Sequence, residues 1–264
     1  MKRLPGEFGY QVVSLLLAII AVHAVYVTTV RPRADVELAE QFARMQVDPG
    51  YVPERSAWVI LRDFEQEACF VLMLWAMAIM AYKGLLGGRE RGLLAREFVP
   101  LESGSRILPE DAHEYSRQLE ALPDAEQRAL LPRSLLAALH RFAATRSIQD
   151  VSTTARAVCE AESERLDSEL SMVRYIAWAI PSIGFIGTVR GIGDALGQAH
   201  QAVEGNIAGV TQSLGVAFNS TFIALLISIV LMFLLHQLQL QQERLVLDTE
   251  VYLDRRLIRH MRVQ

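Results

Sequence analysis

The chain has 264 residues, of which 52% are hydrophobic and 21% charged, and its formal net charge is -4. This modest acidic charge gives no case for nucleic-acid binding, which needs a clustered basic face. The two cysteines, Cys69 and Cys159, stand far apart in different contexts. They fit neither a disulfide framework nor a metal site, so we expect two unpaired structural thiols.

The apolar residues concentrate in four continuous blocks of about 20 residues, with the charged residues between them. A helix of that length crosses the ~30 Å hydrocarbon core of a bilayer. Continuous rather than alternating apolar runs favour helices over the strands of a membrane barrel. We therefore predict an all-α integral membrane protein with four transmembrane helices, at Tyr10–Val30, Ala68–Leu86, Tyr175–Leu196 and Leu214–Leu235.

The first block follows Lys2 and Arg3, as the core of a secretory signal would. It is too long for such a core and lacks a persuasive small-residue cleavage site. We expect a retained first span within residues 1–30. His23 lies inside this span; it is either part of a proton relay or a neutral histidine that faces other helices.

The distribution of Lys and Arg predicts the orientation, because cytoplasmic segments carry an excess of them. Basic residues precede the first and third spans, follow the second and fourth spans, and are absent from residues 197–213. The loop 31–67 carries five arginines, which run against this pattern, and its many acidic residues count for little in the rule. We expect both termini and residues 87–174 in the cytoplasm, and residues 31–67 and 197–213 outside. The mix of polar and apolar residues in the outer loop 31–67 predicts surface helices at Val36–Met45 and Ala57–Phe64.

The cytoplasmic segments have helical character. Prolines at positions 109, 123 and 132 punctuate the first of them, and a proline starts or ends a helix more easily than it lies inside one. From Ser147 to Arg174 no Pro or Gly interrupts the chain, which predicts a helix that continues into span three. The C-terminal residues 236–264 extend span four in the same way. These helices pack on each other, form a docking surface for a cytoplasmic partner, or do both.

Spans three and four are rich in small and hydroxyl residues, whereas spans one and two are bulky and apolar. Lipid gives helices no hydrophobic reason to associate, so close approach through small residues and interhelical hydrogen bonds must hold them together. The small residues follow one face of each helix, which predicts a packing seam. Its members are Gly184, Gly187, Gly191, Ala217 and Ala224.

Hydroxyl groups at matching depth on the same two helices also suit the lining of a narrow polar path. Such a path must be built from side chains, because the helical backbone is already hydrogen-bonded internally. The predicted channel-lining residues are Thr188, Thr221, Ser220, Asn219 and Ser228, with the two threonines as the best candidates. The alternative interpretation is that these residues serve packing alone.

Two further features lie in span three. Pro181 frees a backbone carbonyl and permits a kink, which is either a fixed bend or a hinge. Arg190 is the one full charge deep within a span, with Asp194 one helical turn later. The two form either an interfacial ion pair or a channel-mouth charge that selects ions or contacts a partner.

No carboxylate lies in the middle of any predicted span; Glu65 and Glu67 precede span two, and Asp194 is near the end of span three. A proton-conducting protein needs a titratable group at mid-membrane, so we expect a partner to supply it. The sequence also contains no nucleophile–base pair, metal cluster or phosphate-binding loop. We therefore expect neither enzymatic activity nor a metal or cofactor.

Residues 181–192, Pro-Ser-Ile-Gly-Phe-Ile-Gly-Thr-Val-Arg-Gly-Ile, resemble the P-x-x-G-x-x-G-T-V-x-G signature of the MotA/TolQ/ExbB proton-channel family. Residues 216–225 resemble the A-L-x-x-T-x-x-G-L segment of the same family. Four spans and a large second loop look more like the flagellar-stator branch than the three-span branch. The chain departs from the family at Val216, where the TolQ and ExbB type has Glu, at Ala224, a family glycine, and at Arg190.

The resemblance implies the channel subunit of a bacterial inner-membrane motor or energy-transducing complex. It implies a homopentamer around two copies of a single-span partner of the MotB, ExbD or TolR type. The transmembrane Asp of that partner would carry the proton. The complex would act on a cytoplasmic or periplasmic effector. On this resemblance Thr188 and Thr221 are the channel threonines and Pro181 is the span-three proline.

Two rival functions remain at the level of sequence. A membrane scaffold would use the same seams for assembly without ion conduction. A small-molecule transporter is disfavoured because spans three and four show no inverted repeat of spans one and two. The sequence leaves open whether the ion is H⁺ or Na⁺ and which machine is driven.

Overall fold

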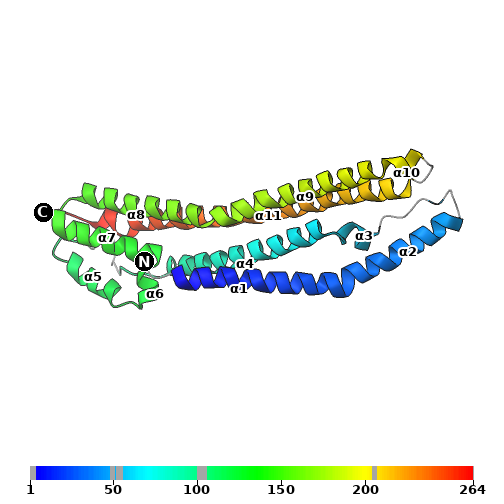
Figure 1. Cartoon of the computed structure of the whole chain (residues 1–264). Helices are drawn as coiled ribbons and strands as arrows, with labels where there is room; N and C mark the ends of the chain where they lie inside the picture. Colours follow the sequence, from blue (N-terminus) through cyan, green and yellow to red (C-terminus); the bar gives the residue numbers. More distant parts are fainter. Residues whose placement is uncertain (1–3, 48–50, 52–55, 100–105, 204–206, 264) are drawn as a thin grey trace. The chain divides into compact units, whose positions relative to one another are not determined.

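The structure is a computed structural model that describes residues 4–47, 51, 56–99, 106–203 and 207–263. Within these residues every secondary-structure element is a helix (Figure 1), which confirms the all-α fold class. The elements in chain order are α1 (Leu4–Val25), the π-helix η1 (Tyr26–Val30), α2 (Arg31–Val47), α3 (Ala57–Leu61), α4 (Phe64–Leu93), α5 (Ala112–Glu120), α6 (Asp124–Gln127), α7 (Leu130–Thr145), α8 (Ile148–Glu169), α9 (Ser171–Gly197), α10 (Ala199–Val203), α11 (Ala208–Arg256) and the 3₁₀-helix η2 (Ile258–His260).

Four helical segments in the described part of the chain are long and apolar enough to cross a membrane. They lie in α1 and its continuation, in α4, in α8 with α9, and in α11. The chain is therefore a multi-pass helical membrane protein, as predicted. Lys2 and Arg3, on which part of the predicted orientation depends, lie outside the described residues.

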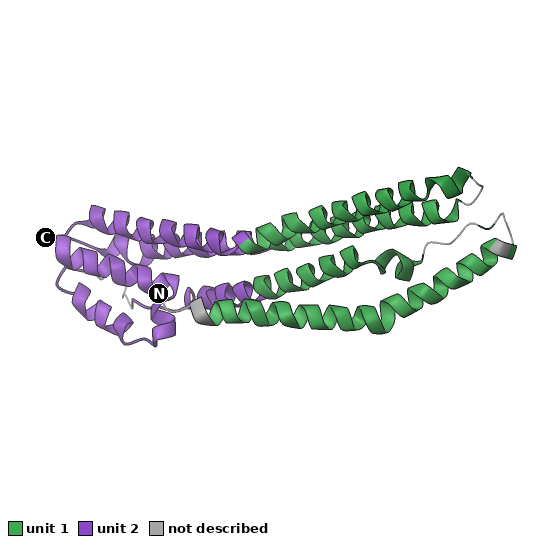
Figure 2. Ribbon diagram, viewed as in Figure 1, with its two compact units in different colours: residues 1–80, 172–235 green, residues 81–171, 236–264 purple. Residues whose placement is uncertain are grey.

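The chain divides into two compact units (Figure 2). Residues 1–80 and 172–235 form one, here called the membrane unit because it holds most of the apolar stretches. Residues 81–171 and 236–264 form the other, here called the helical unit. Each unit combines segments from distant parts of the sequence.

In the membrane unit, α1 continues through η1 into α2, so the predicted outer helix Val36–Met45 begins earlier, at Arg31. Pro32 is the second residue after η1; it has no N–H to donate, so the regular hydrogen-bond ladder is interrupted there. The N–H of Arg31 donates to the carbonyl of Tyr26, five residues back. A proline and a π-helical turn are recognised causes of helix bends.

Helices α1 and α4 are joined by polar contacts from aromatic side chains. The indole N–H of Trp75 donates to the carbonyl of Gln11 at 2.9 Å, and the Tyr10 hydroxyl donates to the carbonyl of Ala78 at 3.1 Å. These contacts use the polar tips of side chains whose bodies are apolar, so they cost little in an apolar environment.

The helical unit has its own core. Buried residues of α5, α7 and α8 pack with the last turns of α11, and Cys159 is among them as a free, buried thiol. Pro123 directly precedes α6 and Pro132 lies in the first turn of α7, as expected for helix-starting prolines. The Glu90 carboxylate accepts a hydrogen bond from the N–H of Leu130 at 3.2 Å and so satisfies a free donor at the start of α7.

Helices α8 and α9 follow one another with a single residue, Leu170, between them, rather than as one uninterrupted helix. Leu170 is fully buried, and its N–H donates to the carbonyl of Asp167 three residues back. Its backbone, at φ -89° and ψ -3°, closes a tight turn that a regular α-helix does not contain.

Candidate polar seam between α9 and α11

Helices α9 and α11 of the membrane unit pack through the small residues predicted from the sequence. Gly184, Gly187 and Gly191 are all buried. A Cβ atom added at Gly184 would lie 2.5 Å from the Cβ of Ala224, and one at Gly191 would lie 2.7 Å from the backbone N of Ala217. Both distances are shorter than non-bonded heavy atoms tolerate. The glycines are therefore what lets the two helices approach this closely.

The Thr188 and Thr221 hydroxyls contact each other across this seam. The Thr221 hydroxyl also donates to the carbonyl of Gly184 at 2.9 Å, and the Thr188 hydroxyl lies 3.1 Å from the carbonyl of Ala217. Each threonine is thus hydrogen-bonded to the facing helix while its side chain stays only partly buried. The result is a pair of hydroxyls at the edge of a tightly packed seam.

The other predicted channel-lining residues of α11 take different places. Ser220 is fully buried, and a Cβ atom at Gly187 would lie 2.6 Å from its Cβ atom. Its hydroxyl donates to the carbonyl of Ala217 at 3.0 Å, inside the seam. Asn219 is half-buried. Ser220 therefore lies on the packing side of the seam, whereas the two threonines lie at its edge.

Ser228 pairs with the backbone group that Pro181 leaves free. A proline in a helix lacks the N–H that would bond the carbonyl four residues earlier, which here is the carbonyl of Ala177. The Ser228 hydroxyl of α11 donates to that carbonyl at 3.2 Å. An unpaired carbonyl is costly in a lipid environment. The Ser228 hydroxyl of α11 therefore compensates for the hydrogen bond that Pro181 removes from α9.

Arg190 has its main partner on another span, which the sequence did not indicate. Its Nε and Nη2 atoms each donate to one carboxylate oxygen of Glu65 in α4, both at 2.8 Å. The predicted partner Asp194 lies farther away, with 3.9 Å between the closest charged atoms. Asp63, just before α4, is half-buried, and burial raises the pKa of its carboxyl group. The sequence indicated that Arg190 needs a carboxylate partner, but it did not indicate that this partner is Glu65.

A second ionic cluster links α1 and α2 to α4. The Glu67 carboxylate lies 2.7 Å from His23 Nδ1 with one oxygen and binds Arg31 with the other. The Arg31 guanidinium lies 4.5 Å from the centre of the Phe64 ring, and the Tyr26 side chain is buried next to it. His23, for which two interpretations were open, thus pairs with a carboxylate. Glu65 and Glu67, two residues apart, bind different neighbours.

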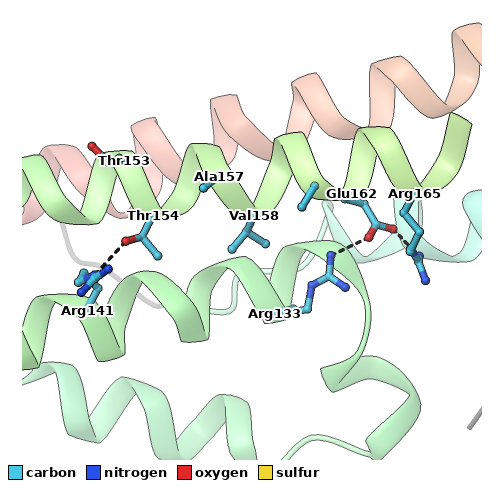
Figure 3. Close-up of a pocket in the computed structure, with 9 residues that line it drawn as sticks. Arg133, Arg141, Thr153, Thr154, Ala157, Val158, Glu162 and Arg165 are labelled. Carbon is cyan, nitrogen blue, oxygen red and sulfur yellow. Dashed lines mark hydrogen bonds and ion pairs between the residues drawn. The ribbon is translucent and has the colours of Figure 1, made fainter. Parts of the chain in front are cut away.

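The helical unit contains an open groove between α7 and α8 (Figure 3). Buried Glu162 accepts hydrogen bonds from Arg133, at 2.7 Å, and from Arg165. Arg141 donates to the Thr154 hydroxyl at 3.1 Å. Three guanidinium groups line this groove and make its rim basic. Those of Arg133 and Arg165 are paired with the Glu162 carboxylate.

The described residues contain no group of three or more His, Cys, Asp and Glu side chains that could hold a metal ion. Together the observations define a multi-pass helical membrane protein in which two adjacent spans share a glycine-packed seam edged with hydroxyl groups.

Residues 126–251 match the family model of the MotA/TolQ/ExbB proton channel family, which confirms the resemblance seen in the two motifs. The match includes α9 and most of α11, and therefore the whole seam. No curated protein and no solved structure matches the chain. The matched family is a proton-channel family, and this supports an ion-channel subunit in general.

Proposed function

We propose that this chain is the channel-forming subunit of an energy-transducing complex, in which ion flow past the α9/α11 seam drives rotation or force. The observation that carries the proposal is the Thr188–Thr221 hydroxyl pair at the edge of that seam. A hydroxyl both donates and accepts a hydrogen bond, so a pair of them can pass a proton along or replace part of an ion's hydration shell.

The proposal requires a carboxylate from another protein. Residues 182–189 of α9 and 214–235 of α11 contain neither Asp nor Glu, so the seam itself offers hydroxyl groups but no group that titrates. We propose a single-span partner of the MotB, ExbD or TolR type whose transmembrane Asp faces the threonines. Five copies of the present chain around two partner helices would place several seams around that carboxylate.

We further propose a bacterial inner-membrane location with both termini in the cytoplasm, and no enzymatic activity. This orientation is supported by the Lys and Arg residues that follow the second and fourth apolar stretches and by their absence from residues 197–213. The helical unit would then lie in the cytoplasm, where its groove is available to a downstream effector.

The test is proton flux in proteoliposomes that contain the complex with its co-purified partner. Thr188→Val and Thr221→Val keep the side-chain shape and remove the hydroxyl, and Thr188→Ser retains it. Loss of one hydrogen bond of about 1 kcal/mol corresponds to about fivefold, so we expect at least a fivefold lower flux from each Val variant and near wild-type flux from the Ser variant. Thr28→Val, an exposed threonine of η1, is the matched control. Wild-type flux from both Val variants in intact complexes would contradict the assigned roles.

The competing function is a membrane scaffold that uses the seam for assembly alone. The close glycine contacts support assembly equally well. A scaffold predicts no flux from the wild-type complex and partner binding that does not depend on a proton gradient. The same proteoliposomes therefore distinguish the two functions.

A further inference from the structure

His23 places an ionisable side chain within the first apolar stretch, on α1 of the membrane unit. Its Nδ1 atom lies 2.7 Å from one oxygen of the Glu67 carboxylate, and the His23 side chain is 60% exposed. The Glu67 side chain is only 12% exposed and binds Arg31 with its other oxygen. An ionisable residue inside a membrane span is a candidate functional site, and the function proposed for the α9/α11 seam makes no use of this one.

The contact with Glu67 determines which nitrogen of His23 carries a hydrogen. The Arg31 guanidinium is always charged, and it pairs with the ionised form of the Glu67 carboxyl group. An ionised carboxylate only accepts hydrogen bonds, so the Nδ1 atom of His23 must donate. The Nε2 atom of the neutral ring then has a free lone pair that can take up a proton. Because most of the side chain is exposed, this second nitrogen is accessible.

The charged groups near this contact include more carboxylates than arginines. Ion pairs and electrostatic contacts connect them, and the phenol of Tyr26 and the thiol of Cys69 lie among them as uncharged groups. A proton on His23 therefore adds positive charge where negative charge is in excess, and it leaves no cation without a counter-charge. The carboxylates are Asp35, Asp63, Glu65, Glu67 and Asp194, and the arginines are Arg31, Arg62 and Arg190.

Polar groups connect this contact with an exposed residue of α2. The Asp35 side chain is 68% exposed, and its carboxylate lies 3.7 Å from Arg62. Arg62 interacts electrostatically with Asp63, and Asp63 interacts with Arg31. Arg31 binds Glu67, the partner of the imidazole. The imidazole is therefore the last member of a polar cluster that begins at an exposed carboxylate, and this cluster gives a proton a polar route to the ring.

We propose that His23 is a proton-binding site of this chain, separate from the hydroxyl pair of the α9/α11 seam. Its Nε2 atom takes up the proton, while its Nδ1 atom donates to Glu67 in both charge states. Proton uptake puts opposite charges on the two partners of this hydrogen bond and so strengthens the contact between α1 and α4. The ligand is the proton itself, so this inference does not depend on ion conduction by the chain.

The test follows the charge state of His23 by ¹⁵N NMR of the full-length, histidine-labelled chain in nanodiscs, from about pH 5 to about pH 9. The chain contains six histidines, and His23→Gln identifies the signals of His23 by their absence. We expect Nε2 to titrate within this range and the neutral ring to carry its hydrogen on Nδ1.

Two variants should change the proton affinity of His23 in opposite directions. Glu67→Gln removes the facing negative charge, so the proton affinity should fall at least about tenfold, which lowers the titration midpoint by about one pH unit. Arg31→Gln removes a positive charge from the cluster, so the midpoint should rise. Glu40→Gln makes the same change as Glu67→Gln at an exposed carboxylate of α2. It is the matched control and should leave the midpoint unchanged.

Three results would overturn the inference. One is a wild-type His23 that does not titrate in this range. Another is a neutral ring that carries its hydrogen on Nε2. The third is an equal midpoint in the wild type and Glu67→Gln, since the contact with Glu67 is then structural only. If Glu67→Gln does not fold, the wild-type spectra and Arg31→Gln still decide. A wild-type complex without ion flux would contradict the proposed channel function and leave this titration unaffected.

Discussion

The two helix pairs of the membrane unit are held together in different ways. In α9 and α11, glycine and alanine bring the backbones into contact, and hydroxyls bond to carbonyls of the facing helix. In α1 and α4, the side chains are bulky, and polar contacts from residues such as Trp75 and Glu67 join the helices. The first kind of contact fixes the backbones closely, and the second leaves many large apolar side chains of α1 exposed.

The comparison teaches that the two pairs should respond differently to substitution. A seam of glycines has no space for an added methyl group. A helix pair joined by a few polar contacts should tolerate changes of shape but not the loss of a charge partner. Three predictions test this difference, from the largest expected effect to the smallest.

Gly184→Ala should produce the largest effect. The new Cβ atom would lie 2.5 Å from that of Ala224 and 3.1 Å from the Cα of Thr221, so the helices must move apart at a cost of about 2 kcal/mol. Gly193→Ala, on the same helix, meets nothing within 4 Å and should stabilise α9 by about 0.5–1 kcal/mol through helix propensity. Unfolding of the purified protein in detergent measures both, and equal stability of the two variants would contradict the close packing.

Glu67→Gln should have the next largest effect. It removes the charge that Arg31 and His23 share, and the Arg31 side chain is only 23% exposed. Breaking a fully buried pair costs about 3–5 kcal/mol; partial exposure of the partners reduces our expectation to about 1–2 kcal/mol. Asp35→Asn, whose exposed carboxylate lies 3.7 Å from Arg62, is the matched control and should change stability by less than about 0.5 kcal/mol. A Glu67→Gln variant as stable as this control would show that the cluster does not hold α1 to α4.

Ser228→Ala should produce the smallest of the three effects. The carbonyl of Ala177 would lose the hydroxyl that replaces the N–H missing at Pro181, at a cost of about 1 kcal/mol. The additional change Pro181→Ala restores an N–H donor at that position, so the serine substitution should cost little in the Pro181→Ala background. A double-mutant cycle measured by detergent unfolding checks this coupling, and additive effects would contradict it.

Periodicity and composition were sufficient to predict the membrane class and the helical fold, and the resemblance of residues 181–192 and 216–225 to known motifs indicated the family. The three-four spacing of small residues also predicted the seam, because one face of a helix is defined by sequence spacing alone. Thr188 and Thr221 were assigned to these stripes for the same reason, whereas the contact between their hydroxyls was seen only in the structure. Whether they line an ion path remains a prediction.

Partners across the fold could not be predicted in the same way. The sequence did not indicate that the Ser228 hydroxyl bonds the carbonyl freed by Pro181. That Ser228 lines an ion path stays a prediction. Arg190 was paired with Asp194 by helical spacing, whereas Glu65 of α4 holds it more closely. In both cases the contact joins residues that are distant in the sequence, and helical spacing alone cannot identify such partners.

The sequence by itself determined which segments enter a membrane, and which faces of α9 and α11 are small enough to pack closely, because hydrophobic length and helical periodicity are properties of a single chain segment. Only the tertiary structure decided which carboxylate neutralises which base. Glu65 and Glu67 are two residues apart in α4, yet one binds α9 and the other binds α1 and α2. Charge pairing depends on distances between helices, and those distances follow from how the side chains pack.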